Sequence, residues 1–180
     1  MRLFIASDLH GSAYYTQKML QRYSEEKTDM MLLLGDLLYH GPRNDLPEGY
    51  DTKKTAELLN SVRHGIIWIQ GNCDAEVDQM VLSFPMHREM AFESKAGTVL
   101  ATHGHVYNDE KPPYPGFDGI LLCGHTHVCG FKEADGYLYM NPGSISIPKD
   151  GTPHSYMITD METYTIKDLD ENIIRSMTVI

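Results

Sequence analysis

The stretch Leu3-Phe4-Ile5-Ala6-Ser7-Asp8-Leu9-His10 sets the pattern of the whole chain: a short apolar run of strand length, followed at once by side chains that bind metals. Four further apolar runs of the same kind follow, at 30–34, 66–69, 98–101 and 120–123. The runs are continuous rather than alternating, so both faces of each predicted strand are expected to be covered.

Helical patterns separate the first three runs. Hydrophobic spacing of three and four residues recurs over 16–23 and again over 55–62, where Asp51 or Thr52 is the candidate N-cap. A shorter helix is predicted to open at Asp74 and to carry Val77, Met80 and Val81. This alternation of strands and helices predicts a parallel sheet with helical crossovers in the first half of the chain.

The second half is predicted to be mainly strands. Turn signals lie at 95–97 and at 135–136, and the segments 155–159 and 163–167 read as a hairpin. Two packed sheets with helices outside satisfy both halves, and a length of 180 residues predicts one domain spanning 1–180. Two loops rich in Pro and Gly, 39–50 and 108–119, are candidate lids.

Composition narrows the classes of partner. Fifteen Lys and Arg residues against 25 Asp and Glu residues give a net charge of −10, which argues against binding to duplex nucleic acid or to an anionic membrane. We find neither a signal-peptide pattern nor a membrane-spanning apolar run, and three cysteines favour a reducing compartment. We therefore expect a cytoplasmic protein with a small substrate.

Every apolar run is followed by residues that bind metals. The set comprises two carboxylates, one amide and four imidazoles: Asp8, His10, Asp36, Asn72, His103, His125 and His127. Ligands gather at the carboxyl ends of strands in α/β sheets, so these side chains are expected to meet. A mixed nitrogen and oxygen set without thiolates suits Mn, Fe, Zn, Co or Ni.

Seven ligands are too many for one cation with an open position, but they suit two cations if Asp36 bridges them. Two such ions can deprotonate a shared water to a bridging hydroxide and can clamp phosphoryl oxygens during in-line attack. The sequence therefore predicts a hydrolase that acts on phosphoric ester bonds. Taken singly, each short motif is more often a turn, and only the five together carry the prediction.

The order of these motifs resembles that of the calcineurin-like metallophosphoesterase superfamily, whose pattern reads D-x-H, G-D, G-N-H-[DE], H and G-H-x-H. The short chain resembles the small bacterial and archaeal branch of that superfamily. The resemblance implies an α/β fold, an αββα four-layer sandwich of two mixed β-sheets flanked by helices, with manganese as a frequent activating ion. It also implies one metal held by Asp8, His10, Asp36 and His127, and a second held by Asp36, Asn72, His103 and His125.

The chain departs from the family pattern at Cys73, where relatives have a histidine thought to protonate the leaving oxygen, while the following Asp74 matches, and both are candidate catalytic residues. A thiol is a weak proton donor, so we expect a phosphodiesterase that cleaves activated aryl diesters well and alkyl monoesters poorly. The alternative for Cys73 is a small inert thiol beside the site.

Two further residues are candidates for contact with substrate. Arg43 follows the second ligand strand, where a guanidinium can pair with a phosphate, although a solvated loop charge is the alternative. His105 lies two residues beyond His103 and is expected to orient substrate or a ligand. Exposed aromatic residues such as Tyr114 and Phe117 favour a homo-oligomer.

Three other functions share most of these features. A phosphomonoesterase would use the same metals with a better acid than Cys73. A non-catalytic scaffold of the same fold is disfavoured because all seven ligand positions are filled. A nuclease would need a basic track along the nucleic-acid backbone, which a net charge of −10 does not favour.

Overall fold

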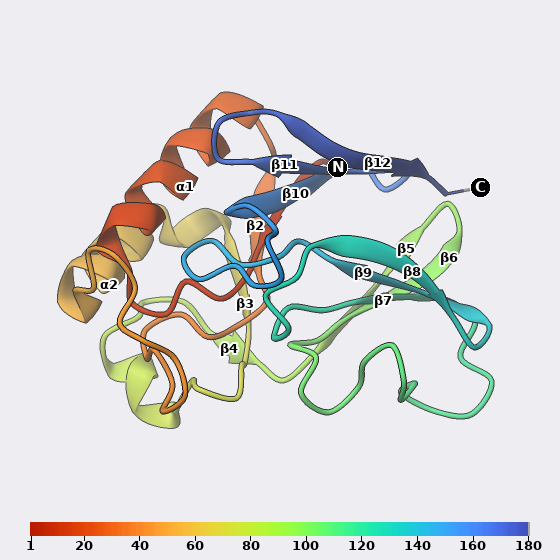
Figure 1. Ribbon diagram of the computed structural model, residues 1–180, viewed down its shortest axis with the longest axis horizontal. Helices are drawn as coiled ribbons and strands as arrows, with labels where there is room; N and C mark the ends of the chain where they lie inside the picture. The colour runs from red at the N-terminus through yellow and green to blue at the C-terminus, as the bar shows by residue number, and fades with distance from the viewer. Residues whose placement is uncertain (180) are drawn as a thin grey trace.

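The computed structural model describes residues 1–179 as two mixed β-sheets packed face to face, with both α-helices over the outer face of one of them, the seven-stranded sheet (Figure 1). The seven-stranded sheet has the order β12 (Ile173–Thr178), β11 (Thr163–Asp168), β10 (Ser155–Thr159), β1 (Leu3–Ala6), β2 (Met30–Leu33), β3 (Ile66–Ile69) and β4 (Met86–His87). The five-stranded sheet has the order β5 (Met90–Ser94), β6 (Gly97–Ala101), β7 (Ile120–Leu122), β9 (Tyr137–Asn141) and β8 (Gly130–Ala134). All five predicted apolar runs form strands.

The helices are α1 (Ala13–Glu26) and α2 (Thr52–Ser61), with short 3-10 helices η1 (Arg63–Gly65) and η2 (Glu76–Met80). Strands β1 to β4 pair in parallel, as the predicted crossovers require, and β10 joins β1 in antiparallel register. Asp51 caps α2 by accepting a hydrogen bond from the backbone N–H of Lys54. Within residues 1–179, neither α-helix has the length and apolar character that crossing a bilayer demands.

The central strand β1 is buried on both faces, as its continuous apolar run predicted. Phe4 packs beneath the helices with Met19 of α1 and Leu59 of α2. Ile5 points the other way, into the layer between the sheets, where it joins Leu122 of β7. Each fully buried side chain of this size stabilises the fold by about 1.5–3 kcal/mol. Strong burial on both sides fixes the end of β1, and with it the loop that carries Asp8.

The outer layer over the five-stranded sheet is built by the loop between β6 and β7. Phe117 from this loop packs against Leu121 of β7 and Tyr139 of β9. The expected exposure of Phe117 is wrong, because its side chain is 3% exposed, whereas Tyr114 is 56% exposed. The predicted α/β sandwich of two mixed sheets is confirmed, and this loop forms its fourth layer.

The predicted helix opening at Asp74 is also wrong. The segment contains only the single 3-10 turn of η2, and its apolar side chains face solvent, with Val77 61% and Met80 83% exposed. A turn this short offers no stripe that can be buried against the sheet. Asp74 caps no helix, because its carboxylate turns inward to backbone groups of the neighbouring loops.

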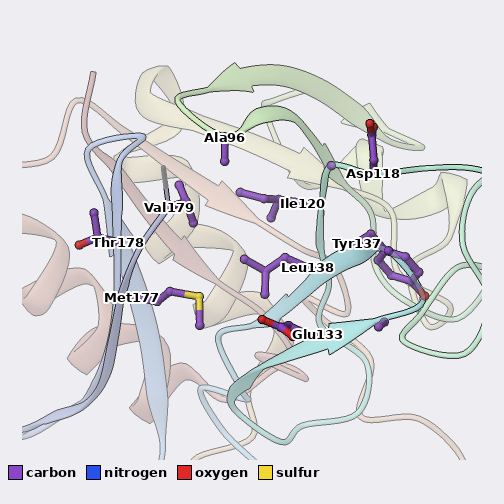
Figure 2. Close-up of a pocket in the computed structure, with 12 residues that line it drawn as sticks. Ala96, Asp118, Ile120, Glu133, Tyr137, Leu138, Met177, Thr178 and Val179 are labelled. Atoms are coloured by element: carbon purple, nitrogen blue, oxygen red, sulfur yellow. The ribbon is translucent and has the colours of Figure 1, made fainter.

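The strands beyond the predicted runs have weaker signals. The turn predicted at 135–136 does join β8 to β9, and the predicted hairpin is β10 and β11. Strand β12 went unpredicted, because it lies at the edge of its sheet and is exposed along most of its length. A cavity of about 430 Å³ opens beside it, where Met177 and Val179 face Ile120 and Leu138 (Figure 2). It lies at the starts of β7 and β9, the opposite end from the candidate ligands.

Candidate metal centre

Five loops bring the candidate ligands to one edge of the molecule. Each loop follows the carboxyl end of a strand: β1, β2, β3, β6 and β7. Six of the seven side chains lie within hydrogen-bond or ion-pair distance of another member of the set, and the ring of the seventh, His125, lies beside that of His103. The expected convergence is therefore seen, with both sheets supplying ligand loops.

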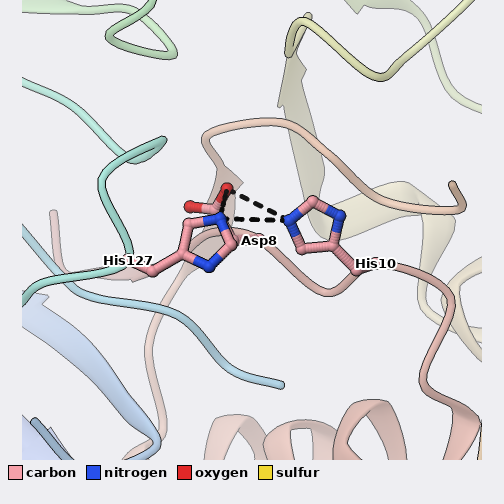
Figure 3. A group of neighbouring side chains, drawn as sticks. All are labelled: Asp8, His10 and His127. Carbon is pink, nitrogen blue, oxygen red and sulfur yellow. Dashed lines mark hydrogen bonds and ion pairs between the residues drawn. The ribbon is translucent and has the colours of Figure 1, made fainter. Parts of the chain in front are cut away.

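A first group comprises Asp8, His10 and His127 (Figure 3). The Nε2 atoms of His10 and His127 lie 3.2 Å apart, and Asp8 Oδ1 lies 3.2 Å from His127 Nε2 and 3.6 Å from His10 Nε2. All three side chains are buried. These ligand atoms face one another closely enough to surround a single cation.

A second group forms around Asp36, Asn72 and His103. His103 Nε2 lies 3.4 Å from Asp36 Oδ2 and 3.0 Å from Asn72 Oδ1, and the ring centroid of His125 lies 5.1 Å from that of His103. Asp36 Oδ2 also lies 3.8 Å from His10 Nε2 in the first group. Asp36 therefore stands between the two groups, where a bridging carboxylate would be required.

Backbone hydrogen bonds fix the tautomer of three of the histidines. Nδ1 of His10 lies 2.8 Å from Tyr39 O, Nδ1 of His103 lies 2.6 Å from Leu34 O, and Nδ1 of His127 lies 2.7 Å from Ile147 O. Because a carbonyl oxygen can only accept, each Nδ1 carries the proton and donates it. In its neutral form, each ring then points the lone pair of Nε2 into the cluster, as metal-binding histidines do.

The negative charge of the buried carboxylate of Asp8 suits the binding of a metal cation. Burial by itself would raise the pKa of Asp8, but the imidazoles of His10 and His127, whose Nε2 atoms lie 3.6 and 3.2 Å from its Oδ1, hold that pKa well below its usual value. Asp8 Oδ1 is nonetheless a buried oxygen with no hydrogen-bond partner among residues 1–179. An ionised, buried oxygen without a donor is costly unless a cation neutralises it. The donor set and this orphan oxygen fit divalent metal ions.

The pKa values of two histidines shift in opposite directions. Burial would lower the pKa of His103, but a hydrogen bond to Asp36 and the nearby carboxylates outweigh burial and raise it to about 9. Burial lowers the pKa of His125 to about 4, helped by its proximity to His103. His125 is therefore neutral near pH 7, the form in which an imidazole binds a metal.

Five of the seven ligand residues adopt positive φ: Asp8 (57°), His10 (46°), Asp36 (57°), His125 (66°) and His127 (63°). Non-glycine residues rarely adopt this left-handed conformation, and each instance costs about 1–3 kcal/mol. Two serine hydroxyls hold Asp8, because Ser144 Oγ and Ser146 Oγ donate to its backbone carbonyl over 2.8 and 3.0 Å. The surrounding loops thus enforce the conformation that turns the ligands inward.

Glycine is required where the ligand loops meet. A Cβ on Gly71 would collide with the carboxylate of Asp36, and one on Gly124 would collide with Ser7. These glycines precede Asn72 and His125, so they let the loops after β3 and β7 approach the loops after β2 and β1. This accounts for the glycine in front of the ligand in each of these motifs.

Asp74, predicted to be catalytic, lies beneath the ligands rather than among them. Its Oδ2 accepts hydrogen bonds from the backbone N–H groups of Asp36 (2.8 Å) and Gly71 (2.7 Å) and from Trp68 Nε1 (3.1 Å). Its Oδ1 accepts a hydrogen bond from the N–H of Leu37 over 2.8 Å. The carboxylate therefore ties the loops after β2 and β3 together.

Cys73 and Arg43 both line a cleft of about 390 Å³ that opens onto His10, His125 and His127. Burial and the neighbouring carboxylates raise the pKa of Cys73 to about 12, so its thiol stays protonated near neutral pH.

Two hydrogen bonds anchor the loop that carries Arg43. Tyr39 O accepts one from His10 Nδ1, and His40 O accepts one from Asn44 Nδ2.

Sequence reasoning missed Lys149, which lines the same cleft from the loop before β10. It lies far from every motif along the chain, and an isolated surface lysine gives no signal. His105, predicted to orient substrate or a ligand, lines a different cleft from Lys149, and its ring centroid lies 5.5 Å from that of His103.

Comparison with known proteins supports the arrangement of these motifs. Residues 1–164 match the calcineurin-like phosphoesterase superfamily domain. The chain is 40% identical over 183 residues to Phosphodiesterase YfcE of Escherichia coli (strain K12), which covers 99% of this chain and 98% of that protein. The solved structure of YfcE, a phosphoesterase from E. coli, matches with a TM-score of 0.93 at 39% identity, over 100% of both chains.

A more distant likeness shows the fold alone. The structure of Vacuolar Protein Sorting 29 from Cryptosporidium parvum matches with a TM-score of 0.60 at 17% identity, over 98% of this chain and 97% of that one. With the family match over residues 1–164 and the full-length relative at 40% identity, the chain belongs to the calcineurin-like phosphoesterase superfamily.

Proposed function

We propose that this protein is a phosphodiesterase that binds two divalent metal ions, manganese foremost, and hydrolyses a small phosphodiester. One observation carries the proposal: Asp36 stands between two ligand groups, 3.8 Å from His10 Nε2 and 3.4 Å from His103 Nε2. The full-length likeness to a named phosphodiesterase supports the same reaction.

The residues divide into two ligand sets. Asp8, His10, Asp36 and His127 would hold one ion, and Asp36, Asn72, His103 and His125 would hold the other. When bound, two divalent cations would activate water near neutral pH and offset the charge of the phosphate. The nitrogen and carboxylate donors suit Mn, and also Zn, Fe, Co or Ni.

The cleft beside the ligands supplies the contacts to substrate. Arg43 and Lys149 place two positively charged side chains in its lining, although the chain as a whole has a net charge of −10. A guanidinium matches the oxygens of a phosphate in bidentate fashion, and an ammonium adds a point charge. These two side chains would draw an anionic substrate into a protein that otherwise repels it.

A diester is favoured over a monoester by Cys73. Its thiol lines the cleft where substrate enters and keeps its proton, but it is a weak hydrogen-bond donor. Leaving groups that need no proton, such as nitrophenolate, are therefore cleaved fastest.

We further propose a cytoplasmic location, consistent with three free cysteines.

Hydrolysis of bis-p-nitrophenyl phosphate tests the proposal. Metal-stripped protein is assayed with and without added Mn²⁺, beside His125→Ala and a matched control, His64→Ala, in which an exposed histidine of η1 is removed. We expect Mn²⁺-dependent turnover that is lost in the first variant and kept in the second. A folded protein that turns over no diester with any divalent ion would instead be a scaffold.

A further inference from the structure

Two clefts, rather than one, meet at the candidate metal centre. The first is the 390 Å³ cleft of Arg43 and Lys149 described above. The second, which we call the Arg88 cleft, has a volume of about 700 Å³ and is lined by Gln70, Arg88, Glu89, Thr102, Val106 and Tyr107 among others. Asn72 lines both clefts. The clefts therefore open on two sides of one candidate metal ligand.

The Arg88 cleft is built by three segments that the fold brings together. The loop after β3 supplies Gln70, the link between β4 and β5 supplies Arg88, and the loop after β6 supplies Val106. The cleft thus lies where an edge of each sheet meets the other, beside β4 and β5. Its lining also includes Asn72 and Asp74, and the carboxylate of Asp74 accepts hydrogen bonds from the backbone N–H groups of Asp36 and Leu37.

The shape of a phosphodiester matches this pair of clefts. Its phosphorus carries two organic arms, which leave the central phosphate in different directions, whereas a monoester carries one. A centre that needed room for one arm would use the 390 Å³ cleft alone. The second volume, about 700 Å³, lies in the usual range of sites for small organic molecules.

The lining of the Arg88 cleft indicates which chemical class of organic group on the phosphodiester it would bind. Arg88 and Glu89 carry opposite charges, and among residues 1–179 neither forms an ion pair with a charged side chain. The Gln70 amide uses one donor in a long 3.4 Å bond to Asp74 O, so its oxygen is open to a ligand. Val106, 42% exposed, adds an apolar wall. Balanced charge, free donors and acceptors and an apolar wall suit an uncharged polar ring.

Resting on the proposed function, we propose that the Arg88 cleft binds one of the two alcohol arms of the substrate, an uncharged ring system with hydrogen-bonding groups such as a nucleoside. The phosphate then sits at the ligand cluster within reach of Arg43 and Lys149, and the other arm extends into the 390 Å³ cleft that these two residues line. The preference for diesters would follow from the presence of two clefts, in addition to the weak acid at Cys73.

Filling the cleft tests the inference. Val106→Trp places a large ring in the Arg88 cleft, and Val77→Trp places the same ring on exposed η2 as a matched control. Diphenyl phosphate and dimethyl phosphate are measured as competitive inhibitors of bis-p-nitrophenyl phosphate hydrolysis. Thermal unfolding checks that both variants fold.

We expect Val106→Trp to raise the inhibition constant of diphenyl phosphate at least tenfold and to leave that of dimethyl phosphate within twofold, while Val77→Trp changes neither. A second variant, Arg88→Ala, should weaken inhibition by a dinucleoside monophosphate more than inhibition by diphenyl phosphate. Equal inhibition constants in Val106→Trp and the unsubstituted protein would overturn the inference. If the unsubstituted protein hydrolyses no diester, the proposed function fails instead.

Discussion

Replacing Asp74 by Asn tests whether this residue positions the ligand loops or takes part in the chemistry. Asp74 accepts four hydrogen bonds, three of them from the backbone N–H groups of Asp36, Leu37 and Gly71. An asparagine keeps one acceptor oxygen, and its NH₂ group must face one of the former donors. The variant therefore retains the shape of the side chain and loses part of its acceptor capacity.

The expected loss of unfolding free energy follows from the number of hydrogen bonds that Asp74 accepts. A hydrogen bond to a charged group contributes about 1.5–3 kcal/mol, against about 0.5–1.5 kcal/mol for a neutral one. Burial, however, raises the pKa of Asp74, so its charged form already bears a desolvation cost that the amide avoids. With these opposing effects, we expect Asp74→Asn to lower the free energy of unfolding by about 2–4 kcal/mol.

The assay is urea unfolding of the metal-free protein, followed by titration with Mn²⁺. Asp78→Asn is the matched control, since Asp78 Oδ2 accepts only the N–H of Ala75 at the start of η2. We expect this control to cost about 1 kcal/mol or less. Weaker Mn²⁺ binding should accompany the loss of stability at Asp74, because the loops of Asp36 and Gly71 lose their common anchor. Unchanged stability and Mn²⁺ affinity with a collapsed kcat would refute a positioning role.

Four further outcomes are expected. Cys73→His should raise turnover of alkyl esters and monoesters about tenfold or more relative to bis-p-nitrophenyl phosphate, and an unchanged substrate profile would show that the thiol does not limit protonation. Mn²⁺ at 100 times its dissociation constant should stabilise the protein by about 2.7 kcal/mol per independent site, seen as a rise in Tm that is smaller in His125→Ala, which keeps the ligands of the other site. Phe117→Ala should cost about 3–5 kcal/mol of unfolding free energy, whereas Tyr114→Ala should stay within about 0.5 kcal/mol. Arg43→Ala should raise KM for the diester about tenfold with an unchanged Tm, and equal KM values would mark Arg43 as a solvated loop charge.

The sequence predicted the elements with strong local signals. Continuous apolar runs located β1, β2, β3 and β7, which are buried on both faces or nearly so, and also β6, which is only partly buried. The same logic failed for η2, where apolar residues at helical spacing are exposed, and for β12, an edge strand with little burial. Local patterns report burial only when the segment packs against the rest of the fold.

The ligand residues of the candidate site could be predicted from the sequence, but the residues and clefts that surround them could not. The ends of the runs identified seven side chains, which the structure brings together. The role of Asp74 could not be predicted, because two of its four donors, the N–H groups of Asp36 and Leu37, lie in a loop that only the tertiary fold brings beside it. Lys149 and the Arg88 cleft were missed for the same reason, since neither has a sequence pattern.

The loop that follows β9 shows why the second half of the chain is needed to hold the first ligand. Ser144 and Ser146 donate to the carbonyl of Asp8, while Asn141 Nδ2 donates to Gly124 O over 2.7 Å. One turn therefore clamps the loop after β1 to the loop after β7, at the point where Asp8 adopts positive φ. Without that clamp, Asp8 could relax and pair its free oxygen with a backbone donor. The hydrogen bonds of this turn hold Asp8 in the conformation that leaves its buried Oδ1 available for a cation.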